Sequence, residues 1–268
     1  MIGTRVEGKA AIVVGGGQTR GETVGNGRAT AIVLGREGAH VCVVDRALAS
    51  AQETVDLITK DGGRAWAFAA DVTREDDVAR LMAAARERFG RIDILHNNVG
   101  ASLALGDAGA TELTEEAFDR SLAVNLKATW LTCKHALPAL REARGSIVNI
   151  ASMAALNAYP LVGYKTTKAA VVAFTENLAA HNAKYGVRAN SILPGLMNTP
   201  MAIESRVAAG TPREEVIAAR DRRVPLGRRM GTGWDVANAA LFLHSEEAGF
   251  ITGVSLIVDG GESVAWGS

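Results

Sequence analysis

Seven short runs of apolar residues divide the chain, and helical segments separate them. The runs cover residues 10–14, 40–45, 65–71, 92–98, 146–150, 188–193 and 254–261. Each run is continuously apolar, which is typical of strands in a parallel sheet that is covered on both faces. We therefore expect an α/β fold in which one doubly wound domain spans residues 1–268, with a seven-stranded parallel sheet and helices on both faces.

Start and stop signals predict where the intervening helices begin and end. The expected starts are a capping box of Ser50 with Glu53, a similar pair of Thr73 with Asp76, and the sequence Thr211-Pro212-Arg213-Glu214. The expected stops are Gly62–Gly63, Gly90, and Lys184 with Gly186. No Pro/Ser-rich linker and no repeat interrupts the alternation of strands and helices, which supports a single domain.

Composition excludes several classes of function. The chain has 268 residues, 48% of them hydrophobic, and its 29 basic and 29 acidic residues balance. Nucleic-acid and anionic-membrane binding surfaces need a basic excess, so neither partner is expected. Cys42 and Cys133 are expected to be core residues in a reducing compartment, and the five histidines have no metal-ligand spacing, so no metal is expected. The first apolar run is too short for a signal peptide or a membrane span, and we expect a cytoplasmic protein.

The stretch from Gly145 to Lys168 carries the strongest candidate for chemistry. A strand (146–150) leads through a loop to a helix that is expected to begin near Gly163. Tyr164 and Lys168 are four residues apart and share one helix face, where the ammonium would lower the pKa of the phenol from its usual value of ~10. Ser152 lies just beyond the strand's carboxyl end, where open α/β sheets bind ligands. Taken alone, the Tyr-Lys spacing also fits an ordinary surface helix.

A glycine-rich turn at residues 15–27 joins the first strand to a helix. Such a turn lets backbone N–H groups approach a pyrophosphate, although the spacing GxGxxG is absent and a flexible surface loop is the alternative. Asp45 ends the second strand, where a carboxylate can accept hydrogen bonds from an adenosine ribose and repel a 2′-phosphate. Arg46 could instead bind a 2′-phosphate, and an aspartate at a strand end can also be a simple turn former.

Together these features resemble the short-chain dehydrogenase/reductase family over nearly the whole chain. The matching motifs, in order, are the glycine turn, Asp71-Val72, Asn97-Asn98-Val99-Gly100, Asn125, Ser152, Tyr164, Lys168, Pro194-Gly195 with Thr199-Pro200-Met201, and the terminal ITGVSLIVDGG. The resemblance implies a Rossmann fold and hydride transfer between a nicotinamide and an alcohol or carbonyl carbon.

Two departures from the family pattern stand out. Val14 replaces the threonine of the family's TGxxxGxG turn, and nine residues separate Gly15 from Gly25 where the family has three. A six-residue insertion therefore lies within residues 16–24, beside the expected cofactor phosphates. The family's NNAG reads NNVG here, and the larger Val99 is expected to narrow the adenosine side of the site.

The resemblance also implies the roles of individual residues. Tyr164 would be the general base in alcohol oxidation, Lys168 would lower its pKa and bind the nicotinamide ribose, and Ser152 would donate to the reacting oxygen. Asn125 would hold a water that links Lys168 to solvent; its alternative is a mid-helix residue bonded to its own backbone. The expected cofactor-binding residues are Gly15, Gly25, Asn26, Gly27, Asp45, Asp71, Val72, Asn98, Gly100, Tyr164, Lys168, Pro194, Gly195 and Thr199.

The expected substrate-binding residues are mostly apolar. They are Ser152, Met153, Leu156, Tyr159, Tyr164, Leu196 and Met197, with a lid segment at about residues 196–225. This composition favours a hydrophobic or cyclic alcohol or ketone rather than a charged metabolite, although each methionine and leucine also fits ordinary core packing. The lid carries Arg206, Arg213, Arg220, Arg222 and Arg223, for which a solvated helix face is the default interpretation and carboxylate recognition the alternative.

The leading hypothesis is an NAD-dependent alcohol dehydrogenase or carbonyl reductase that acts on a small molecule. One alternative is an NADPH-dependent oxoacyl or keto reductase that uses Arg46 or Arg20, and another is a noncatalytic dinucleotide-binding module. Apolar residues on the helix Glu115–Leu137 and on the Tyr164 helix exceed what one sheet face needs. Family members pair these helices across two-fold axes, so a homotetramer is expected.

Overall fold

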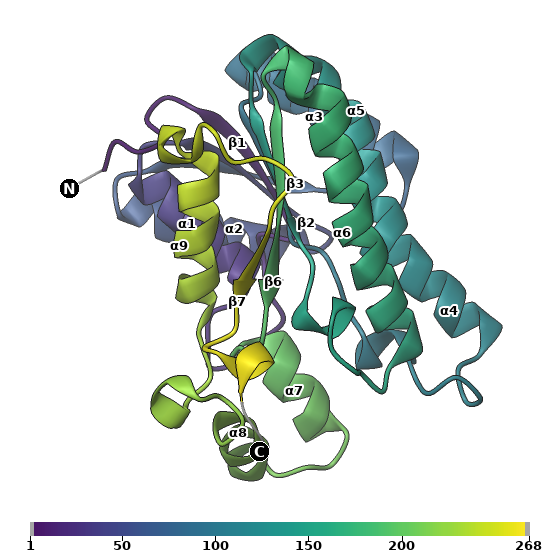
Figure 1. The fold of residues 1–268 in the computed structure, drawn as a ribbon. Helices are drawn as coiled ribbons and strands as arrows, with labels where there is room; N and C mark the ends of the chain where they lie inside the picture. Colours follow the sequence, from purple (N-terminus) through teal and green to yellow (C-terminus); the bar gives the residue numbers. More distant parts are fainter. Residues whose placement is uncertain (1–2, 266–268) are drawn as a thin grey trace.

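A computed structural model describes residues 3–265 and contains one parallel sheet of seven strands in the order β3-β2-β1-β4-β5-β6-β7 (Figure 1). The strands are β1 (Ala10–Val14), β2 (His40–Asp45), β3 (Arg64–Ala69), β4 (Ile94–Asn97), β5 (Ser146–Ile150), β6 (Arg188–Pro194) and β7 (Ser255–Val258). Each corresponds to one of the predicted apolar runs, so the predicted sheet is confirmed. The chain reverses its direction of travel across the sheet between β1 and β4, which places a crevice beyond their carboxyl ends.

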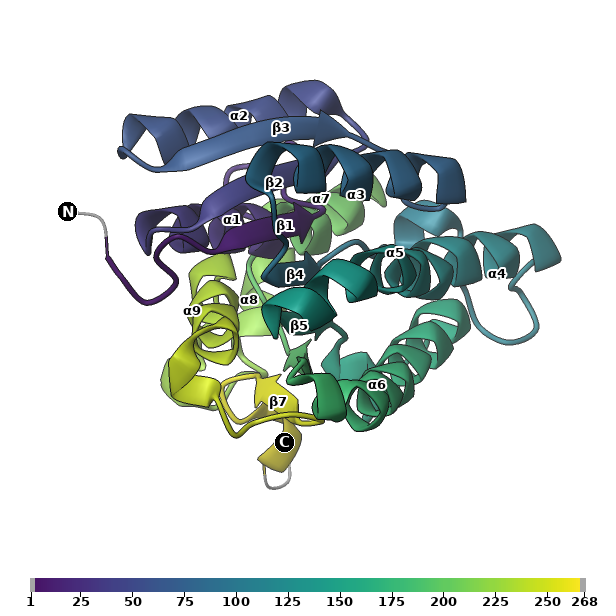
Figure 2. The same ribbon diagram turned by 90° about the horizontal axis from the view of Figure 1, so that it is seen from above.

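Nine α-helices of the described residues cover the sheet and its carboxyl edge (Figure 2). They are α1 (Asn26–Arg36), α2 (Leu48–Lys60), α3 (Glu75–Phe89), α4 (Glu115–Leu122), α5 (Ala128–Ala143), α6 (Val162–Asn182), α7 (Pro200–Ala208), α8 (Arg213–Asp221) and α9 (Gly233–His244). Helices α1, α2 and α9 pack on one face, and α3, α5 and α6 on the other. None of the helices within residues 3–265 combines the length and apolar character that a membrane crossing requires.

Strand β1 shows why the apolar runs are continuous. Ala11 and Val13 belong to the hydrophobic cluster beneath α1, α2 and α9, whereas Ile12 and Val14 belong to the cluster beneath α3, α5 and α6. Successive side chains of a strand point to opposite faces, and here both faces are buried. A polar residue at any of these positions would therefore lose its hydration on either side.

The predicted helix stops agree with the structure better than the predicted starts. Gly62, Gly90 and Gly186 all have positive φ at or just after helix ends, as expected. The capping box at Ser50 is wrong: α2 begins at Leu48, because the Ser50 hydroxyl donates to the carbonyl of Gln18 instead.

The other two predicted starts are also displaced. Thr73 does not cap α3, which begins at Glu75, because its hydroxyl donates to the Asp71 carboxylate at 2.7 Å. Helix α8 begins at Arg213, so Pro212 rather than Thr211 occupies the N-cap position. The hydroxyls of Ser50 and Thr73 thus bond to loop residues at the carboxyl edge of the sheet and do not cap their helices.

The helix expected over 115–137 is interrupted. Helix α4 ends at Leu122, a π-helical turn follows over Ala123–Lys127, and α5 then runs from Ala128. Such π-turns are frequently found at functional sites. This one contains Asn125, which is completely buried.

Candidate active site

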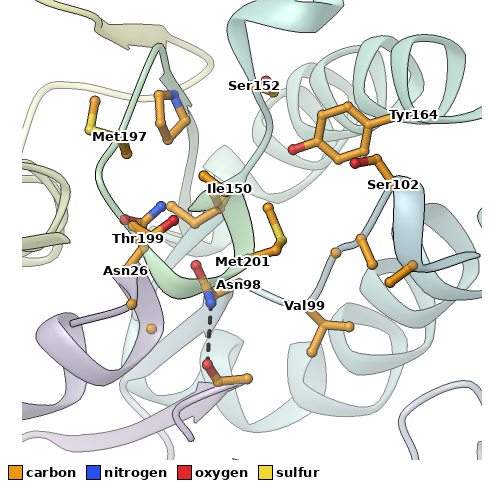
Figure 3. Close-up of a pocket in the computed structure, with 18 of the residues that line it drawn as sticks. Asn26, Asn98, Val99, Ser102, Ile150, Ser152, Tyr164, Met197, Thr199 and Met201 are labelled. Atoms are coloured by element: carbon orange, nitrogen blue, oxygen red, sulfur yellow. Dashed lines mark hydrogen bonds between the residues drawn. The ribbon is translucent and has the colours of Figure 1, made fainter. Parts of the chain in front are cut away.

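A cavity of about 1020 Å³ runs along the carboxyl edge of the sheet. Its wall is formed by the loops after β1 to β6 and by residues of the lid segment (Figure 3). It brings together every residue expected to bind cofactor: Gly15, Gly25, Asn26, Gly27, Asp45, Asp71, Val72, Asn98, Gly100, Tyr164, Lys168, Pro194, Gly195 and Thr199. Of the expected substrate residues, Ser152, Met153, Tyr159, Leu196 and Met197 line it, whereas Leu156 does not and is 57% exposed.

The glycine turn forms one end of the cavity. Gly15 has φ +77°, and its carbonyl accepts a hydrogen bond from Asn98 Nδ2 at 3.2 Å, the dashed line in Figure 3. A Cβ on Gly27 would lie 2.0 Å from this carbonyl, so only glycine fits at the start of α1. The two ends of the turn are therefore packed at the sheet's crevice, whereas residues 19–22 are exposed.

This end of the cavity has the features that a dinucleotide pyrophosphate requires. The N-cap of α1, Gly25, offers no side chain to the free N–H groups, and the first turn of the helix holds no acidic residue. Free N–H groups and the positive end of a helix dipole suit a bound anion, so the residues fit the phosphates of a nicotinamide dinucleotide.

Part of the insertion also lines the cavity. Gln18 is fixed to α2, because its N–H donates to Ser50 Oγ at 2.8 Å, and its Oε1 accepts from the N–H of Gly25 at 3.0 Å. Gly17, Gln18 and Thr19 face the cavity, whereas residues 20–24 lie outside its wall. The outer part instead reaches the lid, where Glu22 Oε1 lies 3.5 Å from Arg213 Nε.

Asp45 lies where β2 ends, and its carboxylate borders the cavity. Its Oδ1 accepts from the N–H of Ala47 at 3.0 Å, and Gly17 lets the backbone of the first turn pass close by, since a Cβ there would lie 2.6 Å from Oδ2. Arg46 lines the same part of the cavity and is exposed. Val99 also lines it and lies against Gly15, as expected from its larger side chain.

Ser152, Tyr164 and Lys168 meet at the other side of the crevice. Ser152 begins a short 3₁₀ turn after β5, and Tyr164 lies in the first turn of α6. Lys168 is 2% exposed, donates from Nζ to the carbonyl of Ile150 at 2.8 Å, and lies 5.7 Å from the centre of the Tyr164 ring. The last residue of β5 thus fixes the lysine, and the turn that follows this strand carries the serine.

Burial controls the ionisation of this pair. It raises the pKa of the Tyr164 phenol to about 12, against a hydrogen bond from Ser152 that works in the opposite direction. It also lowers the pKa of Lys168 to about 8. The expectation that the pKa of Tyr164 lies below its usual value is therefore wrong for the protein by itself, because loss of hydration outweighs the hydrogen bond from Ser152.

Asn125 lies close to Lys168 but does not line the cavity. Its Oδ1 accepts from the N–H of Ala101 at 2.8 Å and its Nδ2 donates to the Ala101 carbonyl at 3.0 Å. The alternative that it bonds its own helix backbone is wrong. A Cβ on Gly100 would lie 2.8 Å from Lys168 Nζ and 3.2 Å from Asn125 Oδ1, so the amide and the ammonium both approach this glycine.

One positioning residue was missing from the sequence-based site. Asp107 is 6% exposed and accepts from the N–H groups of Gly163 at 2.8 Å and Tyr164 at 2.7 Å. Its carboxylate therefore neutralises the free N-terminus of α6 and fixes the turn that carries Tyr164. No local signal identifies it, since 56 residues separate it from Gly163.

The substrate end of the cavity is lined by mixed side chains. Met153 and Met197 are buried, and the Tyr159 ring lies 5.8 Å from that of Tyr164. Met201 of the lid segment also lines it, as does Ser102, which the sequence analysis did not assign to the site (Figure 3). So do three of the lid arginines, Arg206, Arg220 and Arg223. Across residues 3–265 no cluster of three or more His, Cys, Asp or Glu could hold a metal ion.

A doubly wound sheet with this crevice and this Ser-Tyr-Lys arrangement defines a Rossmann-fold oxidoreductase. A family model described as enoyl-(acyl carrier protein) reductase matches residues 22–263. The chain is 39% identical to L-fucose dehydrogenase of Bos taurus, with 99% of this chain and 93% of that protein aligned. It is 36% identical to 2-(R)-hydroxypropyl-CoM dehydrogenase of Xanthobacter autotrophicus, over 90% of this chain and 95% of that one.

A solved structure agrees with these matches. The crystal structure of a protein described as a short-chain dehydrogenase/reductase, from Burkholderia xenovorans, superposes with a TM-score of 0.93 at 41% identity and covers 98% of this chain and 100% of its own. The chain belongs to the short-chain dehydrogenase/reductase family. It is therefore an oxidoreductase of a family whose dehydrogenases use nicotinamide cofactors.

Proposed function

We propose that the protein is an NAD-dependent dehydrogenase that transfers a hydride between the nicotinamide and a secondary alcohol or ketone with a hydrophobic or cyclic body. The observation that carries this proposal is one continuous cavity. The glycine turn and Asp45 form one part of its wall, and Ser152, Tyr164 and Lys168 form another. Relatives described as L-fucose dehydrogenase and 2,5-dichloro-2,5-cyclohexadiene-1,4-diol dehydrogenase support an alcohol as the substrate.

The bound nicotinamide would accept or supply the hydride, and the chain's own residues would handle the proton. In the oxidation direction, Tyr164 takes the hydroxyl proton as general base, and in reduction it returns that proton. Ser152 donates to the reacting oxygen and stabilises the charge that develops there. Lys168 favours the phenolate and binds the nicotinamide ribose. Asn125 fixes the backbone at Ala101 beside Lys168, and we assign it the family's proton-relay role.

Asp45 is proposed to select NAD over NADP. A 2′-phosphate would bring a second anion against its carboxylate, a repulsion on the order of 1 kcal/mol in a water-like environment and several times that where the site is partly dry. Arg46 is exposed and free to swing into solvent, whereas the Asp45 carboxylate accepts from the N–H of Ala47. We expect NAD to bind about tenfold more tightly than NADP.

The experiment combines cofactor titration with turnover. Binding of NAD and NADP, measured by fluorescence quenching, is followed by a panel of secondary alcohols at high pH with reduced nicotinamide as the readout. Asp45→Asn should remove most of the preference, while Arg46→Ala should leave it unchanged. Equal Michaelis constants for the two cofactors in the native protein would show that Asp45 does not face the ribose, and absence of any turnover would favour a noncatalytic binding module.

One observation favours the NADPH-dependent reductase as a second candidate. Arg46 lines the cavity beside Asp45, within reach of a phosphate in that region. Arg20, the other candidate, lies on the outer part of the insertion and does not line the cavity. Arg46 thus carries the alternative alone, and tighter binding of NADP that is lost in Arg46→Ala would establish it.

We also propose that the protein is a homotetramer in the cytoplasm. Trp130 on α5 is 42% exposed, in keeping with a helix that pairs with another copy. The expected surplus of apolar residues is smaller than the sequence suggested, because Leu131, Val171 and Leu178 are buried within the chain itself. Sedimentation as a monomer at micromolar concentration would contradict the tetramer.

A further inference from the structure

Three arginines of the lid segment face the cavity at its substrate end. Arg206 lies on α7, Arg220 on α8, and Arg223 just after α8, and all three belong to the cavity wall together with Tyr159 and Met197. We propose that the substrate carries an anionic group, a carboxylate, sulfonate or phosphate, which Arg206 and Arg220 bind while the carbinol carbon faces Tyr164. The proposal rests on the proposed function and names the substrate class for the same site.

Arg220 is the residue that most needs such a ligand. Its guanidinium donates to the thioether of Met230 at 3.2 Å and to the carbonyl of Met197 at 3.4 Å, and no carboxylate of residues 3–265 lies within 4.0 Å of it. A thioether is a weak acceptor, so most of the charge is uncompensated. Burial, together with the neighbouring Arg206 and Arg223, lowers the pKa of Arg220 to about 10, while Tyr159 and Glu262 act in the opposite direction. A bound anion would relieve this cost.

The other lid arginines differ in their partners. Arg213 is paired with Glu204 at 2.6 Å and with Glu22, and Arg223 is paired with Glu262 at 2.6 Å. Arg206 donates to the Ala202 carbonyl of its own helix at 2.6 Å and, within the described part of the chain, has no carboxylate partner. Arg223 thus has a carboxylate partner in this part of the wall, whereas Arg206 and Arg220 have none within 4.0 Å among residues 3–265.

Tyr159 connects the arginines to the chemistry. Its ring lies 5.8 Å from that of Tyr164, and its hydroxyl is close enough to Arg220 to influence its ionisation. The two arginines, Tyr164 and the apolar Met197 therefore line the same cavity, so a bound anion and the reacting carbon would share it. A cavity that has an apolar lining and two arginines for the acid group of the substrate selects hydroxy or keto acids over neutral alcohols.

The test compares acids with their neutral counterparts. Secondary alcohols with one carbon skeleton, each prepared as a carboxylate, a sulfonate, a phosphate and a methyl ester, are assayed with NAD by initial rates. We expect kcat/KM for at least one anionic series to exceed that of the ester by about 10- to 100-fold, as for a charge-assisted hydrogen bond. The best series identifies the anion.

Variants assign the effect to the arginines. Arg220→Met and Arg206→Met should each lower kcat/KM for the preferred acid by about tenfold or more, mainly through KM, and change the ester by less than about threefold. Arg222→Met is the matched control, since Arg222 is exposed on the same segment and does not line the cavity, and it should behave as the native enzyme. Arg220→Lys retains the charge if the methionine variant proves unstable, and should recover part of the preference.

The outcomes separate this inference from the proposed function. Native enzyme that oxidises esters as well as acids, or arginine variants that lose both equally, would overturn the anion subsite and leave the dehydrogenase intact. Absence of turnover with every compound, despite measurable NAD binding, would contradict the proposed function itself. A preference for acids that Arg222→Met also abolishes would assign it to the general charge of the lid and overturn the subsite.

Discussion

The two ends of the cavity are lined by different kinds of chemical group. At the cofactor end, Gly15, Gly25 and Gly27 bring backbone to the wall beside the side chains of Asp45 and Val99, and a Cβ at Gly27 would collide with a carbonyl. At the substrate end, long side chains from α7 and α8 form much of it, among them Arg206 and Arg220. A wall of backbone suits a ligand group that stays the same from one substrate to the next. A wall of side chains can change its substrate preference through single substitutions that leave the sheet intact.

The largest expected effect is at Tyr164, where the two ends meet. Tyr164→Phe removes the proton acceptor and very little volume, so turnover should fall by ~10²–10⁴-fold while NAD affinity remains nearly unchanged. Rate measurements at saturating cofactor together with fluorescence titration check both halves. More than about a tenth of the native kcat in this variant would show that another group moves the proton.

The pH profile should follow the same residue. Because burial raises the pKa of Tyr164 to about 12, its phenol is protonated at neutral pH and must ionise to act as a base. kcat/KM for alcohol oxidation should therefore increase with pH through the alkaline range, by up to about tenfold per pH unit, while ketone reduction should not increase. An oxidation profile that is flat from neutral to alkaline pH would indicate that the proton transfer does not limit kcat/KM.

Deleting the six extra residues within 16–24 tests whether the cofactor end is backbone alone. Gln18 and Thr19 line the cavity, and Gln18 is fixed to Ser50, so their removal should weaken NAD and NADP alike by about tenfold. Titration of both cofactors measures this loss. Thr23→Ala is the control, because Thr23 does not line the cavity and its substitution should have no effect on either cofactor. Unchanged affinity after the deletion would reduce the insertion to a surface loop.

The smallest effect is expected from Asp107. Asp107→Asn retains the shape but removes the charge that faces the N-terminus of α6 and replaces one of the two accepting oxygens with an N–H donor, so the free energy of unfolding should decrease by about 1 kcal/mol and kcat by a few-fold. Asp119→Asn, which alters another acidic residue without a hydrogen bond to α6, is the comparison. Equal stability of the two variants in thermal unfolding would show that Asp107 does not support the catalytic helix.

Features that depend on neighbouring residues in the chain could be predicted from the sequence alone. The strands follow from continuous burial, and the glycine turn and the Tyr164–Lys168 spacing were assigned to the edge of the sheet where they lie. Features that depend on long-range contacts were not accessible in this way. Ser50 and Thr73 have the composition of helix caps but bond to loops, and Asp107 acts on a helix 56 residues away.

The lid arginines show the same limit. Their number and spacing were visible, but which of them would be paired with a carboxylate depends on Glu204, Glu22 and Glu262, which are brought close only by the fold. The ionisation of Tyr164 was misjudged for a related reason. A neighbouring lysine can be read from the sequence, whereas the loss of hydration depends on everything packed around the phenol.

The contact between the insertion and the lid has a thermodynamic consequence. Glu22 meets Arg213 on α8, and a Cβ on Gly21 would lie 2.9 Å from Pro200 at the start of α7. An outward movement of α7 and α8 to admit substrate must either break this contact or carry the loop along. Cofactor binding then changes the free energy of substrate binding, and by linkage substrate binding changes the free energy of cofactor binding by the same amount. The ion pair lies at the surface, so added salt should weaken this coupling first.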